Sequence, residues 1–153
     1  MAHTGEAIQA GFDHLQVIGD RGRGKSTSLL WLCDYFQMQG QAVAYERIPR
    51  WQFDYHTNIS GLDCFALDEA QRLFVLNQMQ LFREAQKKRL LIGTHISWER
   101  SFRRQGWELV TIEIGHHTTR EHMQNILDRR LMVFATEKGV QIYFDDSSID
   151  YLW

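Results

Sequence analysis

The chain has 153 residues, of which 44% are hydrophobic, with a single proline and a formal net charge of -2. This length and apolar content predict one compact domain with an adequate core and argue against a disordered chain. The small net charge excludes a strongly basic nucleic-acid-binding protein, so any DNA contact would need a local patch. No apolar stretch is long enough for a membrane span and no secretion signal is visible, so we expect no membrane partner.

The two cysteines, Cys33 and Cys64, are far apart and lie in apolar segments. We expect both to be buried, reduced core residues and not a disulfide or a metal pair. This use of cysteine is typical of a cytoplasmic protein.

Taken in chain order, the first predicted element is a short buried strand over 14–18, which has alternating and β-branched character. The segment 19–26 then reads Gly-Asp-Arg-Gly-Arg-Gly-Lys-Ser and fits the phosphate-loop pattern G-x-x-x-x-G-K-[ST]. A buried helix over 26–38 follows, because this segment is rich in Leu, Trp and Phe and lacks Gly and Pro. A strand, a glycine loop and a helix in this order support the binding of phosphates.

The residue types of this loop suit a triphosphate. Glycines let successive backbone N–H groups point inward, and the positive end of the following helix adds to the field. Lys25 can reach the β- and γ-phosphates, where it also acts in catalysis, and the Ser26 hydroxyl can ligate Mg²⁺. The predicted nucleotide-binding residues are Gly19, Asp20, Arg21, Gly22, Arg23, Gly24, Lys25, Ser26 and Thr27. A glycine turn that binds nothing remains the alternative.

Further strands are predicted over 42–45, 62–67, 89–92 and 109–114. An irregular crossover over 47–61 joins the second and third strands, a long helix over 69–88 follows the third, and a short helix over 97–105 precedes the fifth. Beyond the fifth strand, a capping box at 118–121 begins a helix that ends at Gly139, and alternation over 140–144 indicates an edge strand or hairpin. Strands that alternate with helices predict a parallel α/β sheet with right-handed crossovers.

The second motif with chemical meaning is Cys-Phe-Ala-Leu-Asp-Glu over 64–69, an apolar strand that ends in two acids. Asp68 would lie beside the Mg²⁺ shell as the second metal-site residue after Ser26, and Glu69 would orient a water toward the γ-phosphate as the general base. The alternative is that the two acids only stabilise the start of a helix through its dipole.

These two segments carry a family resemblance. Residues 19–26 resemble a Walker A motif, and residues 64–69 resemble a Walker B motif with a catalytic glutamate after the aspartate. The pair is similar to P-loop ATPases of the ASCE division, which have an additional strand, and most similar to AAA+ ATPases of the DNA-transposition and secretion-associated branch. The resemblance covers most of residues 14–115. It implies ATP and Mg²⁺ as cofactors and a three-layer P-loop NTPase fold with a mainly parallel five-stranded sheet. We expect one domain over 1–153, with a core of about 14–115 and a short helix–strand extension over 116–153.

The resemblance also implies a polar sensor of the γ-phosphate at the end of the fourth strand. Thr94 is the candidate and His95 the substitute, while a strand-ending Thr with solvent contacts is the alternative. An arginine finger usually precedes the fifth strand in oligomeric AAA+ proteins, and Arg103 and Arg104 occupy that stretch, with Arg100 on the same helix face. A basic surface for a phosphate backbone, or a solvated face, remain the alternatives for these arginines.

Aromatic residues also alternate in the crossover, where Trp51, Phe53 and Tyr55 lie near Arg47 and Arg50. Such a mixture can stack on single-stranded nucleic acid, fold back onto the core, or bind a protein. The sequence does not decide between these.

We therefore expect a cytoplasmic, ATP-binding and Mg²⁺-dependent ATPase domain that acts as a nucleotide switch for a DNA or protein partner, in a DNA-transposition-type or other multi-component system. A protein partner or a homo-oligomer is expected, and hydrolysis is expected to be weak without it. Two alternatives stay open. One is a phosphotransferase that acts on a small acceptor, and the other is a nucleotide-binding scaffold without hydrolysis.

Overall fold

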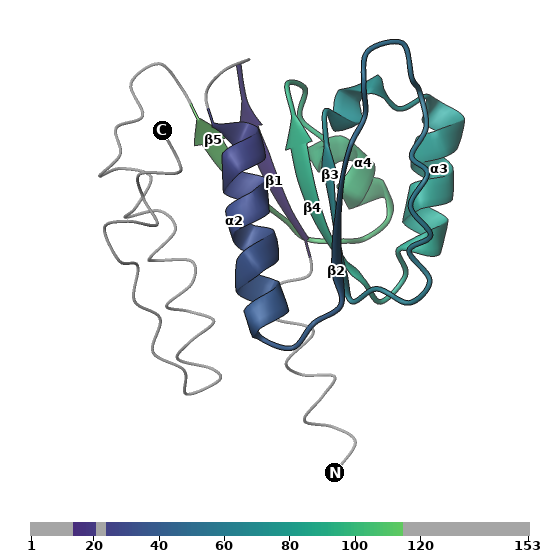
Figure 1. Cartoon of the computed structure of the whole chain (residues 1–153). Helices are drawn as coiled ribbons and strands as arrows, with labels where there is room; N and C mark the ends of the chain where they lie inside the picture. The colour runs from purple at the N-terminus through teal and green to yellow at the C-terminus, as the bar shows by residue number, and fades with distance from the viewer. Residues whose placement is uncertain (1–13, 21–23, 115–153) are drawn as a thin grey trace.

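The computed structural model describes residues 14–20 and 24–114 (Figure 1). In chain order its elements are β1 (His14–Gly19), α2 (Lys25–Met38), β2 (Val43–Arg47), β3 (Cys64–Asp68), the 3-10 helix η1 (Ala70–Arg72), α3 (Val75–Glu84), β4 (Arg89–Thr94), α4 (Glu99–Arg104) and β5 (Leu109–Ile114). The helix and strand predicted over 118–144 lie outside the described residues, so the division into core and extension stays a prediction.

The strands form one sheet in the order β2-β3-β4-β1-β5, and every neighbouring pair is parallel. This confirms the parallel α/β sheet predicted from the sequence. The strand β4 lies between β1, which precedes the phosphate loop, and β3, which ends in Asp68. It has the place of the additional strand that the resemblance implied. Because parallel strands end at the same edge of a sheet, Gly19, Asp68 and Thr94 come to one edge, where α/β sheets bind their ligands.

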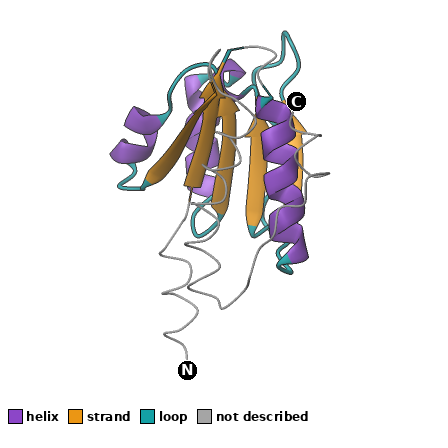
Figure 2. Cartoon of the chain, turned by 90° about the vertical axis from the view of Figure 1, so that its left-hand side faces the viewer, coloured by secondary structure: helices purple, strands orange, loops and turns teal. Residues whose placement is uncertain are grey.

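Helices cover both faces of the sheet and give three layers (Figures 1 and 2). On β3, Cys64 and Ala66 belong to the core cluster that includes α2, whereas Phe65 and Leu67 belong to the cluster that includes α3 and α4. This alternation is the period of two of an extended strand. Burial on both faces explains why β3 is apolar until it reaches Asp68.

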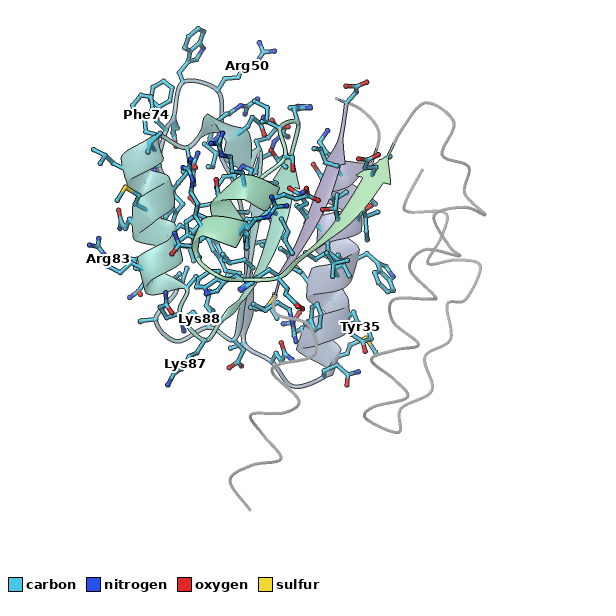
Figure 3. The ribbon with its side chains drawn as sticks, turned by 180° about the vertical axis from the view of Figure 1, so that it is seen from behind. Tyr35, Arg50, Phe74, Arg83, Lys87 and Lys88 are labelled. Carbon is cyan, nitrogen blue, oxygen red and sulfur yellow. The ribbon has the colours of Figure 1, made fainter. Side chains whose placement is uncertain are left out.

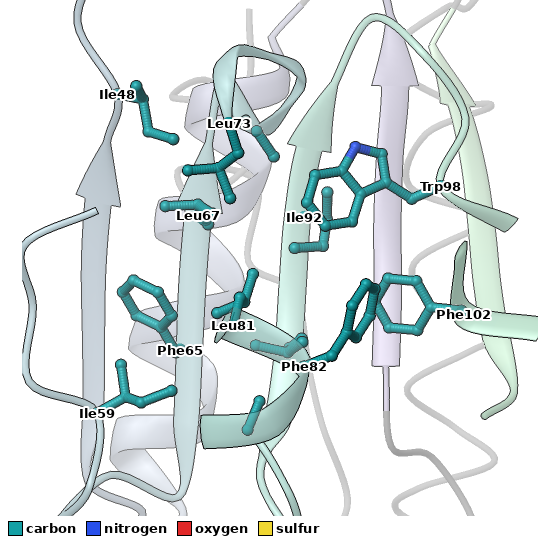
Figure 4. Close-up of a cluster of buried hydrophobic side chains, with 13 residues drawn as sticks. Ile48, Ile59, Phe65, Leu67, Leu73, Leu81, Phe82, Ile92, Trp98 and Phe102 are labelled. Atoms are coloured by element: carbon teal, nitrogen blue, oxygen red, sulfur yellow. The ribbon is translucent and has the colours of Figure 1, made fainter. Parts of the chain in front are cut away.

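The two clusters differ in their side chains. Among the buried residues, those on the α2 side are small or aliphatic apart from Phe36, whereas the other side is rich in aromatic rings (Figure 4). There Phe82 contacts Phe102 edge-on at a centroid distance of 5.1 Å and lies 5.9 Å from Trp98. These contacts fix α3 and α4 against the sheet and so hold the segments that follow β3 and β4 in place.

The prediction of one long helix over 69–88 is wrong. The chain forms the short helix η1, then becomes extended at Leu73 and Phe74 with ψ values of 134° and 155°, and only then begins α3. The backbone N–H of Phe74 donates to the carbonyl of Phe53 at 3.1 Å. This tertiary contact with the crossover competes with the local helix propensity and divides the segment. At the other end, α3 stops at Glu84, and Lys87 has a φ of 63° before β4.

Smaller differences concern the ends of the strands. The third strand was expected over 62–67 but runs over Cys64–Asp68, because the N–H of Leu62 closes a turn on the carbonyl of Ile59. The second strand continues to Arg47, and the fourth passes through Gly93 to Thr94. Each extension carries a polar side chain to the carboxyl edge of the sheet.

Both cysteines are buried, as predicted, and burial raises the pKa of each thiol to about 12. Within residues 14–20 and 24–114, no helix combines the length and the apolar character that crossing a bilayer requires.

Candidate functional site

The residue before α2 has a backbone conformation that glycine adopts much more easily than other residues. Gly24 has a φ of 87° and a ψ of 17°, in the left-handed region. Its carbonyl accepts hydrogen bonds from the backbone N–H of Ser28 at 2.9 Å and from the Ser28 hydroxyl at 2.8 Å, which anchors the first helical turn. The preceding Arg21, Gly22 and Arg23 lie outside the described residues, so their phosphate contacts stay predictions.

Lys25 begins α2 and turns its side chain back toward the end of β1. Its Nζ donates to the backbone carbonyl of Asp20 at 2.7 Å, and the residue is only 5% exposed. Burial lowers the pKa of this ammonium, while the negative charges of Glu69, Asp68 and Asp20 act in the opposite direction. A cation is therefore held beside both acids at the carboxyl edge of the sheet.

Asp68 is fully buried and accepts hydrogen bonds at both carboxylate oxygens. The hydroxyl of Ser26, in the first turn of α2, donates to Oδ2. The hydroxyl of Tyr45 on β2 also donates to Oδ2, at 2.8 Å, and the backbone N–H of Glu69 donates to Oδ1 at 2.9 Å. The structure thus brings together the two residues that the sequence assigned to the metal.

A glycine on β4 makes room for this carboxylate. A Cβ on Gly93 would lie 2.7 Å from Oδ1 of Asp68 and 2.6 Å from Cδ1 of Leu29, both below normal contact distances. Glycine inside a strand weakens it and often marks such a close approach. Gly93 thus allows the backbone of β4 to pass directly beside Asp68, although glycine weakens the strand.

Glu69 has an unusual backbone for a residue with a Cβ. Its φ is 58° and its ψ is 38°, in the left-handed region, and the residue is 5% exposed. Non-glycine residues in this region are uncommon, and strained conformations of this kind concentrate at functional sites. The conformation directs the side chain away from the path of β3 and into a group of polar residues.

Four side chains surround the Glu69 carboxylate. Gln71 donates to Oε2 at 2.6 Å, and Oε2 also lies 3.4 Å from Nη2 of Arg72 and 3.6 Å from Nε2 of His95. On the other side, Oε1 lies 4.0 Å from Nη2 of Arg47. Burial by itself raises the pKa of Glu69, but the Gln71 hydrogen bond and the charges of Arg72, His95 and Arg47 together bring it below its ordinary value. The side chain is therefore an ionised, firmly held acceptor.

The two sensor candidates differ in where their side chains go. The Thr94 hydroxyl donates to the carbonyl of Ile96 at 2.8 Å and accepts from the Ile96 N–H at 3.1 Å, which closes a turn after β4. The ring of His95 instead bridges the site, with Nδ1 2.8 Å from the carbonyl oxygen of Gly19 and Nε2 beside Glu69. In this conformation His95, and not Thr94, joins the end of β1 to the glutamate.

The remaining predicted residues lie at the margins of this group. Thr27 is half-buried in the first turn of α2. Arg100, Arg103 and Arg104 are exposed on α4, and within the described part of the chain no hydrogen bond or ion pair joins them to the phosphate-loop residues or the two acids.

Sequence reasoning missed four residues of the site: Tyr45, Arg47, Gln71 and Arg72. Tyr45 reaches Asp68 only because β2 is the neighbour of β3, and strand order is not readable from the pattern of apolar residues. Gln71 and Arg72 follow Glu69 within one turn, and their polar character in an otherwise apolar stretch was the available signal. In one continuous helix Gln71 at i,i+2 would not face Glu69, whereas Arg72 at i,i+3 would, so the long-helix prediction hid only Gln71.

No family model matches the chain, and no curated protein matches it in sequence. Solved structures do resemble it. A DNA replication initiation factor is similar with a TM-score of 0.53 and 15% identity, covering 98% of this chain and 53% of that protein. DnaA from Aquifex aeolicus, bound to the ATP analogue AMPPCP, is similar with a TM-score of 0.52 and 18% identity, over 98% of this chain and 53% of that one. The chain has a P-loop NTPase fold.

At these identities the likeness concerns the fold alone. The chain spans about half the length of both structures, so what those proteins do as a whole does not transfer to it. Within the shared fold, the described parts of the loop after β1 and the acids after β3 lie at the edge where nucleotide sites of α/β sheets occur.

Proposed function

We propose that this chain is an ATP-binding, Mg²⁺-dependent ATPase domain that acts as a nucleotide switch for a DNA or protein partner. The observation that carries the proposal is the hydrogen bond from Ser26 to Asp68, which unites the phosphate-loop helix with the acid at the end of β3. The fold of an AMPPCP-bound neighbour and the buried ammonium of Lys25 support it.

In this proposal the backbone over 19–24, with Lys25, Ser26 and Thr27, binds the phosphates. The residues present suit Mg²⁺, because a hydroxyl and a carboxylate are the hard oxygen donors it prefers, and Ser26 and Asp68 already lie in contact. When bound, the ion neutralises charge on the phosphate oxygens. Asp68 and Ser26 would hold it, and Tyr45 would keep the carboxylate oriented.

Glu69 is the proposed general base. Its lowered pKa keeps it ionised, so it can accept a hydrogen bond from the attacking water. In the conformation described, however, Gln71, Arg72 and His95 occupy Oε2. Oε1, whose charged neighbour is Nη2 of Arg47 at 4.0 Å, is then the oxygen that would accept from the water. The contacts at Oε2 restrain the side chain, and this restraint supports weak hydrolysis in the isolated domain.

Hydrogen bonds and an ion pair connect Glu69 to the crossover, where a partner could act. The N–H of Ile48 in the crossover donates to the carbonyl of Asp68 at 3.1 Å. Arg72, which pairs with Glu69, donates to the carbonyl of Ile48 at 2.6 Å. A partner that shifts the crossover would therefore also move the group that holds Glu69, and this connection supports the switch.

Two further assignments are part of the proposal. Thr94 would contact the γ-phosphate if its turn with Ile96 opened, and His95 is the residue that already faces Glu69. Arg103 or Arg104 would complete the site of a neighbouring subunit as an arginine finger, for which their exposure on α4 leaves them accessible.

The test is phosphate release from ATP and Mg²⁺, measured for the chain alone and then with single-stranded DNA, duplex DNA and candidate partner proteins. We expect slow release alone and stimulation by one of these additions, with no stimulation of Glu69→Gln. Loss of ATP that depends on a small acceptor, with ADP formed and no free phosphate released, would instead indicate a phosphotransferase. ATP binding without release under any addition would indicate a scaffold and contradict the ATPase.

A further inference from the structure

An apolar surface lies on the crossover and at the start of α3, which we name the crossover patch. It consists of Trp51, Phe53, Phe74, Val75, Leu76 and Met79, each between 41% and 87% exposed. Figure 3 shows Phe74 and Arg50 projecting at the same corner of the molecule. Single exposed apolar residues are ordinary, but six on two segments that the Phe53–Phe74 contact joins are not.

Specific contacts hold the residues of the crossover patch in place. The rings of Phe53 and Phe74 stack with a centroid distance of 4.3 Å and an interplanar angle of 5°. The Phe53 carbonyl accepts from the Phe74 N–H at 3.1 Å and from the Asn77 side chain at 2.5 Å. Trp51 is 87% exposed with a φ of 69°, a conformation that is rare for a bulky residue. Trp51 therefore combines a strained backbone with an indole ring that is exposed to solvent.

The composition of the patch favours a protein over a nucleic acid. Val75, Leu76 and Met79 form an aliphatic surface at the start of α3, and Arg83 follows only in its last turn. Aliphatic side chains neither stack on bases nor bind phosphates. Aromatic side chains bury about 150–250 Å² each. The patch therefore offers several hundred Å², of the order of the roughly 800 Å² that each partner contributes to a standard protein interface.

The charges beside the patch favour a second copy of the same chain. Arg50 has no hydrogen bond or ion pair within residues 14–20 and 24–114, and Asp54 pairs only with His56, at 3.6 Å. Arg50 and Asp54 have opposite charges and lie on the same crossover. The edge of the patch can therefore pair with the same edge of a second copy. In a two-fold contact each surface meets its own copy, and this is the commonest symmetry of oligomers.

We propose that the crossover patch is the interface of a two-fold symmetric dimer, in which Arg50 of each copy faces Asp54 of the other. This inference rests on exposure, stacking and charge, and it does not depend on nucleotide binding.

Sedimentation velocity of the full chain from about 1 to 100 μM tests it, because this range brackets the Kd of a weak interface. We expect the mass to rise with concentration from 18.1 kDa toward twice that value. Leu76→Glu should leave the protein monomeric throughout, because it puts a charge into the centre of the contact. Met38→Glu is the matched control, since Met38 is 85% exposed on α2 outside the patch, and it should dimerise normally.

Charge exchange makes the test specific to two-fold symmetry. Arg50→Asp alone and Asp54→Arg alone should each raise the Kd about tenfold or more, because like charges then face each other. The double exchange should return the Kd to near its original value. A monomer at every concentration, a dimer that Leu76→Glu leaves intact, or a double exchange that restores nothing would each overturn the proposal. So would a monomer that binds a single-stranded oligonucleotide through Trp51.

Discussion

The hydroxyl of Ser26 donates a hydrogen bond to Oδ2 of Asp68, although 42 residues separate the two in sequence. One residue lies in the first turn of a helix on one face of the sheet, and the other ends a central strand. Their contact exists because β1, β3 and β4 all end at the same edge. It turns two sequence motifs into a single arrangement of oxygens that suits Mg²⁺.

Asp68→Asn removes the negative charge while it keeps the shape of the side chain. We expect Mg²⁺-dependent ATP binding to weaken by about tenfold to a hundredfold, because a neutral amide is a poor partner for a hard cation. ATP titrations with and without Mg²⁺ measure this. Asp63→Asn is the control, since Asp63 lies at the opposite end of β3 and accepts from the N–H of Ala42. Equal Mg²⁺ dependence in the two variants would count against a metal role for Asp68.

Tyr45→Phe deletes one hydroxyl from the site. Tyr45 does not touch the metal in this account but orients Asp68, so we expect the Mg²⁺ affinity to fall by about tenfold while ATP still binds. Tyr35→Phe on α2 is the matched control and should change neither property. Thermal unfolding of both variants separates lost orientation from lost stability. An unchanged Mg²⁺ affinity of Tyr45→Phe would show that the hydroxyl has no positioning role.

Glu69→Gln keeps the size of the side chain and removes its basicity. We expect ATP binding to persist and the turnover to fall by about a hundredfold or more, as for the loss of a general base. Phosphate release under single-turnover conditions measures the chemical step. Glu84→Gln, on the exposed end of α3, serves as the control. Full turnover in Glu69→Gln would remove the glutamate from the mechanism.

His14 predicts a pH dependence of stability. Burial, with a smaller contribution from the charge of Arg89, lowers its pKa from 6.5 to about 4, and its Nδ1 accepts from the N–H of Leu90 at 3.1 Å. Between these pH values the unfolded chain binds the proton and the folded chain does not, so the free energy of unfolding falls as the pH drops from 6.5 toward 4. The loss from this residue is roughly 3 kcal/mol.

Denaturant unfolding at pH 7 and at pH 5 measures this dependence. His14→Gln removes the titrating ring and should flatten the difference between the two pH values, although the variant is less stable at both. The His56→Gln variant is the control, because His56 is exposed on the crossover. A pH dependence that survives in His14→Gln would contradict the assignment.

Much of the fold was predictable because it depends on local patterns. The continuous apolar run of β3, the glycine loop and the position of Asp68 at a strand end are all readable from the residues. The division of 69–88 was not, because it follows from the contact of Phe74 with Phe53 in a distant loop. Gln71 and Arg72 are near Glu69 in the chain, but Arg47 of β2 and His95 after β4 reach it only through the strand order.

The central claim is that Lys25 and the loop before it bind the phosphates of a nucleotide. Equilibrium titration with fluorescent ATP and Mg²⁺ tests it most directly, on the unaltered chain, on Lys25→Ala and on Lys87→Ala, in which an exposed lysine after α3 is removed. We expect saturable binding to the unaltered chain and to Lys87→Ala, with an affinity about tenfold to a hundredfold lower for Lys25→Ala. Equal affinity of Lys25→Ala and the unaltered chain would contradict the account.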